Sequence, residues 1–326
     1  MKKTFLAAVV GVAVATAAQA EPINLNLSGG NPGGLWSLLG AGIDRAAKVD
    51  DGDSVITYQA TGGGFANIGL LGANRTDLGL VHDAEANIAL SGGEPFKAPI
   101  ENMRAIGYMY NWAPMHFFLT KDMADEYNID SLDDIATSGA PIRIGINRSG
   151  NITSNVALKM LEEAGITEDM LSDNGGQLVR AGANEQGELI QDGRLDMITN
   201  GIFIQHSSFR AVDENVDVVL LSIPQEVIDA TNEEFGTGTM VIPSGSYKNQ
   251  GADISTVSLG ALLVATEQMD EATAYSLASS LVKNIDEVRA VHKSMQALTP
   301  ELLTTPSVVE FHPGAIKAYT EAGYAK

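Results

Sequence analysis

Three short loops, rich in glycine, hydroxyl and amide side chains, are the parts of this sequence best suited to binding a small anion. They span residues 28–34, 61–64 and 147–151, and each precedes a segment with helical spacing. A glycine loop at the start of a helix presents backbone N–H groups to an anion. One interpretation is therefore carboxylate capture by these groups, and the other is a plain tight turn at each loop. Two such loops on neighbouring strand–helix units favour carboxylate capture more than either loop alone.

The first loop does not have the spacing of a nucleotide-binding motif. Its glycine-rich part is Gly29-Gly30-Asn31-Pro32-Gly33-Gly34. A dinucleotide site requires G-x-G-x-x-G, and Asn31 with Pro32 breaks that register. A P-loop also requires a lysine, which this loop lacks. No nucleotide cofactor is therefore expected.

Two kinds of side chain near these loops are suited to an organic acid. Arg148, in the third loop, has the planar guanidinium that pairs with a carboxylate through two hydrogen bonds. An exposed surface arginine is the alternative. Trp36 and Trp112 are predicted to lie in loops at the cleft and to pack on the ligand's carbon skeleton. A place in the core is the alternative for either tryptophan.

Residue patterns for catalysis or metal binding are missing from the sequence. It contains no cysteine, which excludes thiol nucleophiles and thiolate metal sites. The five histidines do not form the paired spacing of a helical zinc site, and no G-x-S-x-G motif of serine hydrolases is present. They are His82, His116, His206, His292 and His312. His312, which precedes a proline, is expected to be structural. We therefore predict a protein that is not an enzyme, with no catalytic residues, metal or cofactor.

The elements around these loops follow an alternating strand–loop–helix order that predicts an open α/β sheet. In the first half, strands are expected at 23–27, 54–59 and 77–81, with helices at 35–49 and 65–73. The second half begins with a strand at 142–146 and a helix at 153–164. The segment 177–180, a helix at 184–191 and a strand at 196–199 follow. In such sheets ligands bind beyond the carboxyl ends of the strands, where the glycine loops lie.

Two long apolar segments are predicted to cross between two lobes. The strand at 103–120 leaves the first lobe, and the strand at 258–265 returns to it. The first lobe is then formed by residues 21–116 and 257–326, and the second by residues 117–256. We therefore predict an α/β fold with two lobes. Each lobe is a sheet flanked by helices, and two hinge crossings join the lobes around a cleft.

The N-terminus is typical of an export signal. Lys2 and Lys3 precede an apolar run at 5–17, and Ala18-Gln19-Ala20 is a small-x-small cleavage site. The alternative, a membrane anchor, is disfavoured because the run is shorter than the roughly 20 residues that span a bilayer. We predict a signal peptide at 1–20 and a periplasmic mature chain. The formal net charge of −21 disfavours nucleic acid as a partner.

Several stretches together resemble the TAXI family, the receptor proteins of tripartite ATP-independent periplasmic (TRAP) transporters. They are Gly34-Leu35-Trp36-Ser37-Leu38-Leu39-Gly40, Thr61-Gly62-Gly63-Gly64-Phe65-Ala66-Asn67, Asp77-Leu78-Gly79-Leu80-Val81, Ser246-Tyr247-Lys248-Asn249-Gln250 and His312-Pro313-Gly314-Ala315. The third stretch is expected to end in a loop at His82 and Asp83. The sequence departs from the family pattern at Ser37, Gly64, His82, Asp83 and the third loop.

The resemblance implies a two-lobed periplasmic binding protein of the type II-like class. Such a receptor captures a small organic acid, either glutamate-like or a dicarboxylate. The receptor then delivers this ligand to TRAP membrane subunits for uptake driven by an ion gradient. A receptor of an ABC or tricarboxylate-type importer, a periplasmic enzyme on the same fold and an added sensory role remain alternatives. The expected ligand-binding residues are Ser28, Gly29, Trp36, Ser37, Thr61, Gly62, Gly63, Phe65, His82, Asp83, Asn111, Trp112, Arg148, Ser149, Gly150, Asn151, Thr153, Asn200 and Gly201.

Overall fold

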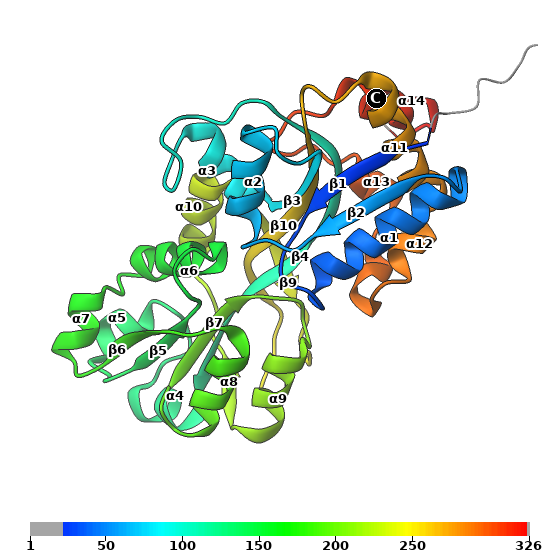
Figure 1. Cartoon of the computed structure of the whole chain (residues 1–326). Helices are drawn as coiled ribbons and strands as arrows, with labels where there is room; N and C mark the ends of the chain where they lie inside the picture. The colour runs from blue at the N-terminus through cyan, green and yellow to red at the C-terminus, as the bar shows by residue number, and fades with distance from the viewer. Residues whose placement is uncertain (1–21, 325–326) are drawn as a thin grey trace, which may run out of the picture.

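The computed structural model describes residues 22–324, which form two lobes joined by long strands (Figure 1). The predicted signal peptide lies outside the described residues. Within residues 22–324, no helix combines the length and the apolar character needed to cross a membrane.

One mixed sheet runs through both lobes, in the strand order β2-β1-β3-β10-β4-β7-β5-β6. Its strands are β1 (Asn24–Ser28), β2 (Val55–Gln59), β3 (Leu78–His82), β4 (Met103–Thr120), β5 (Arg143–Ile146), β6 (Gln177–Arg180), β7 (Met197–Gly201), β8 (Val218–Leu220), β9 (Gly238–Ile242) and β10 (Ile254–Thr266). In the first lobe β1 is parallel to β2 and β3, and in the second lobe β5 is parallel to β6 and β7. Parallel strands bring their carboxyl ends to one edge, so the loops after them meet there.

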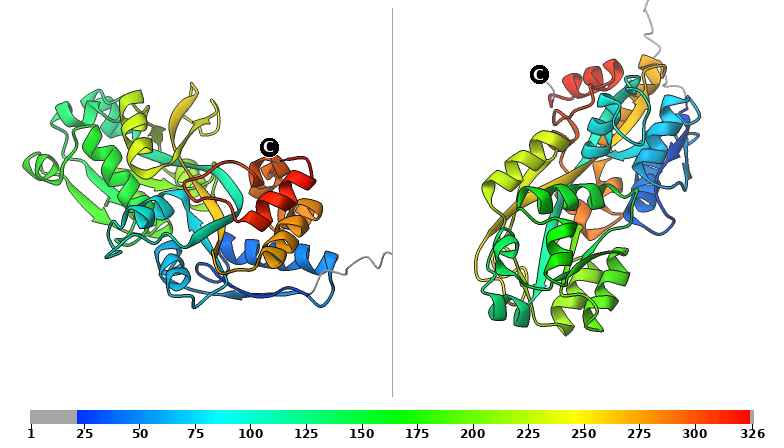
Figure 2. Two further views of the ribbon diagram at one scale, coloured as in Figure 1. Left: turned by 90° about the horizontal axis from the view of Figure 1, so that it is seen from above. Right: turned by 90° about the vertical axis from the view of Figure 1, so that its left-hand side faces the viewer.

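Helices flank the sheet in both lobes. They are α1 (Leu35–Asp50), α2 (Gly64–Gly72), α3 (Asp83–Ser91), α4 (Lys121–Tyr127), α5 (Asp134–Ser138), α6 (Ile152–Glu163), α7 (Glu168–Asp173), α8 (Ala183–Gln191), α9 (Ser207–Asn215), α10 (Gln225–Phe235), α11 (Glu271–Lys283), α12 (Ile285–Arg289), the 3-10 helix η1 (Lys293–Ala297), α13 (Pro300–Leu303) and α14 (Pro313–Glu321). Helix α1 buries Leu39, Ile43 and Ala46, which the helical period places on one face. The chain's C-terminal helices pack beside α1 and cover the first lobe (Figure 2).

Two long strands, β4 and β10, connect the lobes. The first part of β4 pairs with β10, and its last part pairs with β7 and β8 of the second lobe. Strand β10 pairs with β9 at its start and with β3 farther on. Helix α10 also contacts both lobes, because it packs on α6 and on α3. The exact limits of the two lobes remain a prediction.

The predicted elements recur with shifts of one to a few residues at their ends, and the strand at 103–120 has the predicted bounds. Three local predictions are wrong. His82 ends β3 and Asp83 begins α3, so no loop separates them. Trp36 lies in the first turn of α1 and Trp112 lies within β4, because each continues the backbone hydrogen bonding of its element rather than a loop.

His312 has the structural role predicted for it. Its Nδ1 accepts the N–H of Gly314 at 3.2 Å and so caps α14, while its Nε2 donates to the carbonyl of Met269 at 2.9 Å. The ring is buried, and both of its nitrogen atoms have partners.

A second histidine, His116, is fully buried where β4 enters the second lobe. Its Nδ1 donates to the carbonyl of Pro114 and its Nε2 accepts from the hydroxyl of Tyr247, both at 2.9 Å. Aromatic rings, including that of Phe209, surround it. Burial lowers the pKa of His116 to about 4, so the ring stays neutral at physiological pH.

Candidate functional site

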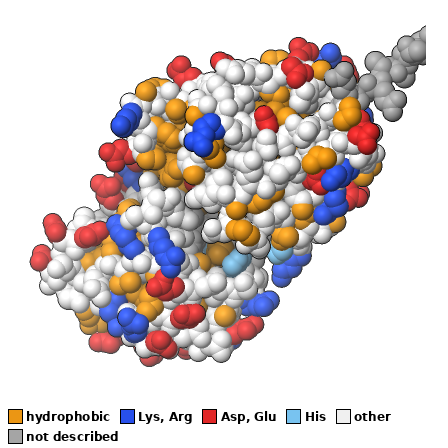
Figure 3. All heavy atoms as spheres, viewed as in Figure 1, with side chains coloured by type: hydrophobic (Ala, Val, Ile, Leu, Met, Phe, Trp, Pro, Cys, Tyr) orange, Lys and Arg blue, Asp and Glu red, His pale blue; other side chains and the backbone are white. Residues whose placement is uncertain are grey.

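A cavity of about 490 Å³ lies between the two lobes. Figure 3 shows the hollow between them, with histidine side chains gathered beside it. The residues that line it are Gly30, Asn31, Gly33, Gly34, Leu35, Trp36, Leu38, Thr61, Gly62, Gly63, Gly64, His82, Glu85, Tyr110, Ala113, Gly150, Asn151, Ile152, Gly201, Ile202, Phe203, His206 and His292. A volume of this order is typical of small-molecule sites.

The N-termini of three helices meet at this cavity. The caps of α1 and α2 are Gly34 and Gly63, and neither helix has a side-chain cap among the described residues. The cap of α6 is Asn151, whose side chain accepts the N–H of Thr153 at 2.9 Å. The first turn of a helix has N–H groups without intrahelical partners, and its dipole favours negative charge. The three helix starts therefore form a positively polarised wall drawn from both lobes.

Two features favour glycine at the start of α2. Gly63 has φ 106° and ψ −164°, a conformation that side chains disfavour strongly. A Cβ atom on Gly64 would clash with the Glu85 carboxylate, because the backbone of α2 lies directly against it. The sequence therefore brings an acidic side chain and the amide groups of α2 to the same side of the cavity.

The Thr61 hydroxyl holds the second glycine loop in place. It accepts the N–H of Gly63 at 3.1 Å and lies 2.6 Å from Oδ1 of Asn67, with the carbonyl of Gly29 as a further partner. Asn67 in turn donates to the carbonyl of Leu80 at 2.7 Å. Thr61 thus ties the loop to the residue that follows β1 and to α2, and Asn67 connects α2 to β3.

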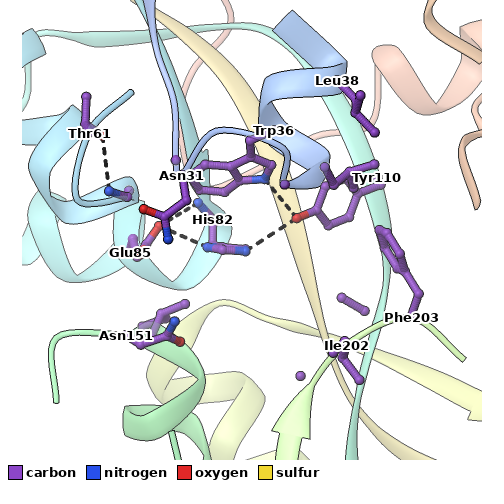
Figure 4. Close-up of a pocket in the computed structure, with 18 of the residues that line it drawn as sticks. Asn31, Trp36, Leu38, Thr61, His82, Glu85, Tyr110, Asn151, Ile202 and Phe203 are labelled. Atoms are coloured by element: carbon purple, nitrogen blue, oxygen red, sulfur yellow. Dashed lines mark hydrogen bonds and ion pairs between the residues drawn. The ribbon is translucent and has the colours of Figure 1, made fainter. Parts of the chain in front are cut away.

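A chain of polar side chains crosses the first-lobe wall of the cavity (Figure 4). Trp36 Nε1 donates to the Tyr110 hydroxyl at 3.1 Å, and this hydroxyl lies 3.4 Å from His82 Nε2. His82 Nδ1 lies 3.1 Å from Glu85 Oε2. Burial lowers the pKa of His82, but the carboxylates of Glu85 and Asp83 raise it by more, so that it stands above its ordinary value. The contact with Glu85 therefore stabilises the protonated form of His82.

Asp83 has a structural role behind this wall. Its Oδ2 accepts the Tyr108 hydroxyl and the N–H of Gly260, each at 2.8 Å. Burial raises the pKa of Asp83 to about 6. The residue joins α3 to both connecting strands and does not line the cavity.

The structure brings eight of the predicted binding residues to the cavity. They are Trp36, Thr61, Gly62, Gly63, His82, Gly150, Asn151 and Gly201. The others lie outside its lining: Ser28, Gly29, Ser37, Phe65, Asp83, Asn111, Trp112, Arg148, Ser149, Thr153 and Asn200. A ligand contact remains a prediction for every residue of both sets.

Arg148 is directed to another partner in this structure. Its guanidinium is 2.7 Å from Oε2 of Glu185, and its side chain is 70% exposed. A role as the main partner of a ligand carboxylate remains a prediction, and it requires this surface ion pair to open.

Several lining residues were not predicted from the sequence. Glu85, Tyr110, Phe203, His206 and His292 are the side chains of most chemical interest among them. The spacing of His82 and Glu85, three residues apart at a helix start, is typical of a capping box and was the one available sequence indication for Glu85. His206 and His292 cap α9 and η1, and nothing in the local sequence indicates that they face one cavity.

The family comparison covers almost the whole chain. Residues 27–323 match the NMT1-like family. The chain belongs to this family. No curated protein sequence matches the chain.

Solved structures show which fold this NMT1-like protein has. A TctC solute-binding protein from Polaromonas superposes with TM-score 0.53 at 14% identity, covering 93% of this chain and 96% of that one. MatC from Rhodopseudomonas palustris, with bound malate, gives TM-score 0.52 at 13% identity, covering 86% and 91%. The periplasmic aliphatic sulphonate-binding protein SsuA from Escherichia coli gives 0.51 at 12%, covering 94% and 80%. The predicted fold, an α/β two-lobed periplasmic binding protein, is confirmed.

Proposed function

We propose that this NMT1-like protein is a periplasmic receptor that captures a small organic acid in the cavity between its lobes. The observation that carries the proposal is the meeting of three helix N-termini, from both lobes, at one cavity. These helix starts supply N–H donors and a favourable dipole for a carboxylate. Among the described residues that line the cavity, none is lysine or arginine, which leaves the backbone groups of the helix starts as donors for the anion in this arrangement of the lobes.

The proposed mechanism is closure of the lobes on the ligand. An acid that contacts α1 and α2 on one side and α6 on the other binds the closed form more tightly than the open form. This difference in affinity shifts the equilibrium between the open and closed forms toward the closed form. We place the lobes at residues 21–116 with 257–326, and at 117–256. Binding without turnover is the proposed activity, and the predicted signal peptide at 1–20 directs export.

Delivery to TRAP membrane subunits is supported by the TAXI-like motifs of the glycine loops. A receptor of a tricarboxylate-type importer is the second candidate, favoured by the likeness to a TctC solute-binding protein. A gene for a TRAP membrane subunit beside this one would support the first candidate.

Small carboxylic acids should stabilise the purified mature protein against heat. A ligand present at 100 times its dissociation constant adds about 2.7 kcal/mol to the free energy of unfolding. Calorimetric melting with malate, glutarate, L-glutamate and L-leucine, against neutral sugars as controls, measures this. Recovery of the unchanged acid afterwards would exclude turnover. Stabilisation by sugars and by none of the acids would contradict the proposal.

A further inference from the structure

We infer that Glu85 recognises a protonated amine on the ligand, so that the captured acid is an amino acid rather than a dicarboxylate. This inference rests on the proposed capture of an organic acid in the cavity between the lobes, and it assigns the ligand's second functional group.

The first observation is an unsatisfied carboxylate oxygen. Glu85 lines the cavity although only 4% of the residue is exposed. Its Oε2 accepts the backbone N–H of His82 at 2.9 Å and faces the ring of the same residue. Within residues 22–324, no donor is hydrogen-bonded to Oε1. A carboxylate oxygen can accept more than one hydrogen bond. Capping of α3 accounts for Oε2 and leaves Oε1 available to a donor in the cavity that Glu85 lines.

The second observation is the position of this carboxylate beside the start of α2. The backbone of Gly64 lies directly against it, since a Cβ atom at that position would clash. The uncapped N–H groups of α2 and the Glu85 carboxylate therefore lie next to each other on one wall. An α-amino acid carries a carboxylate and an ammonium on the same carbon atom. It is thus matched to a wall on which donors and a negative acceptor are neighbours.

The third observation is the charge of the lining. Glu85 is the one carboxylate among the described lining residues, and lysine and arginine are missing from that set. His82, which pairs with Glu85, carries at most one positive charge and can therefore balance only the charge of Glu85 itself. A dicarboxylate would bring two negative charges to this wall, and a zwitterion brings a balanced pair. His206 and His292 also line the cavity and are the remaining ionisable groups that face the ligand, apart from the hydroxyl of Tyr110.

The test uses pairs of acids that differ only in the amine: L-glutamate with glutarate, and L-leucine with 4-methylpentanoate. Calorimetry on the mature chain should give, for at least one pair, an amino acid that binds about tenfold or more tightly than its partner. This is the difference expected for a charge-assisted hydrogen bond. Glu85→Gln should remove the preference within a pair, because it keeps the shape and loses the charge. Glu101→Gln, the same change at an exposed position off the cavity, should keep it.

Each remaining outcome has a defined meaning. Equal binding within each pair, or tighter binding after Glu85→Gln, would overturn the role of Glu85 while leaving capture of an organic acid intact. Binding of malate but of none of the four acids would also overturn the role of Glu85, and binding of none of these five acids would contradict that capture itself. If Glu85→Gln fails to fold, the wild-type pair comparison and Glu85→Asp, which keeps the charge on a shorter side chain, still decide the matter.

Discussion

Gly63→Val should leave the protein folded and weaken the binding of an acidic ligand by at least about 100-fold, roughly 2.7 kcal/mol. Gly63 caps α2 at the cavity with φ 106°, and no atom lies within 4 Å of the position that a Cβ atom would take. A branched side chain therefore projects into open space at the amides that we assign to the carboxylate. It also forces the loop out of its glycine-only conformation, at a cost of about 1–3 kcal/mol. Isothermal titration calorimetry measures the affinity.

Gly139→Val is a matched control for backbone strain. Gly139 has φ 69° and lies outside the cavity lining. No atom lies within 4 Å of the position that a Cβ atom on Gly139 would take. It should lower stability and leave affinity unchanged. Unchanged affinity in Gly63→Val would remove the second glycine loop from the binding site.

Acidification should destabilise the folded protein through His116. The unfolded histidine takes up a proton near its ordinary pKa of 6.5, whereas in the folded chain burial lowers this pKa to about 4. Between these two values the unfolded state binds more protons, so the stability present above pH 6.5 is lost as the pH falls toward 4. The loss is about 2 kcal/mol between pH 7 and pH 5 and about 3 kcal/mol over the whole window.

The measurement is the free energy of unfolding by denaturant at several pH values, for the wild type and for His116→Gln. Other groups titrate in both proteins, so the difference between the two isolates His116. The variant should lose part of the acid sensitivity, although it will be less stable at pH 7 because Tyr247 loses an aromatic neighbour. Parallel stability curves would show that His116 is not the acid-sensitive group.

The fold around the site could be predicted from the sequence because its apolar residues follow the spacing of strands in some segments and of helices in others. Strands with alternating or continuous apolar residues stand next to helices of period 3.6, and glycine loops separate them. Strand β4 has the predicted limits since apolar and aromatic residues make up most of it, above all at 105–110 and 117–119. The start of α3 was missed because no glycine or turn residue separates it from β3, and the cap is formed by His82 and Glu85.

The site was predictable only where local sequence determines it. The glycine loops that begin α1, α2 and α6 reach the cavity because each follows a strand whose carboxyl end faces the cleft. Tyr110 and Phe203 instead meet with ring centroids 5.3 Å apart through the pairing of β4 with β7, which no local pattern encodes. The sequence indicated Arg148 as a carboxylate partner because it is an arginine next to the start of a helix. Its pairing with Glu185 could not be predicted in the same way, because Glu185 lies in another helix, α8.

Small-angle X-ray scattering of the mature protein, with and without a saturating acid, tests most directly whether a ligand bound between the lobes holds them together. The cavity is lined from both lobes, and β4 and β10 connect them. We expect the radius of gyration to fall when the acid that stabilises the protein is added, and to stay constant for Gly63→Val under the same conditions. An identical scattering curve with and without an acid that calorimetry shows to be bound would contradict capture by closure of the lobes.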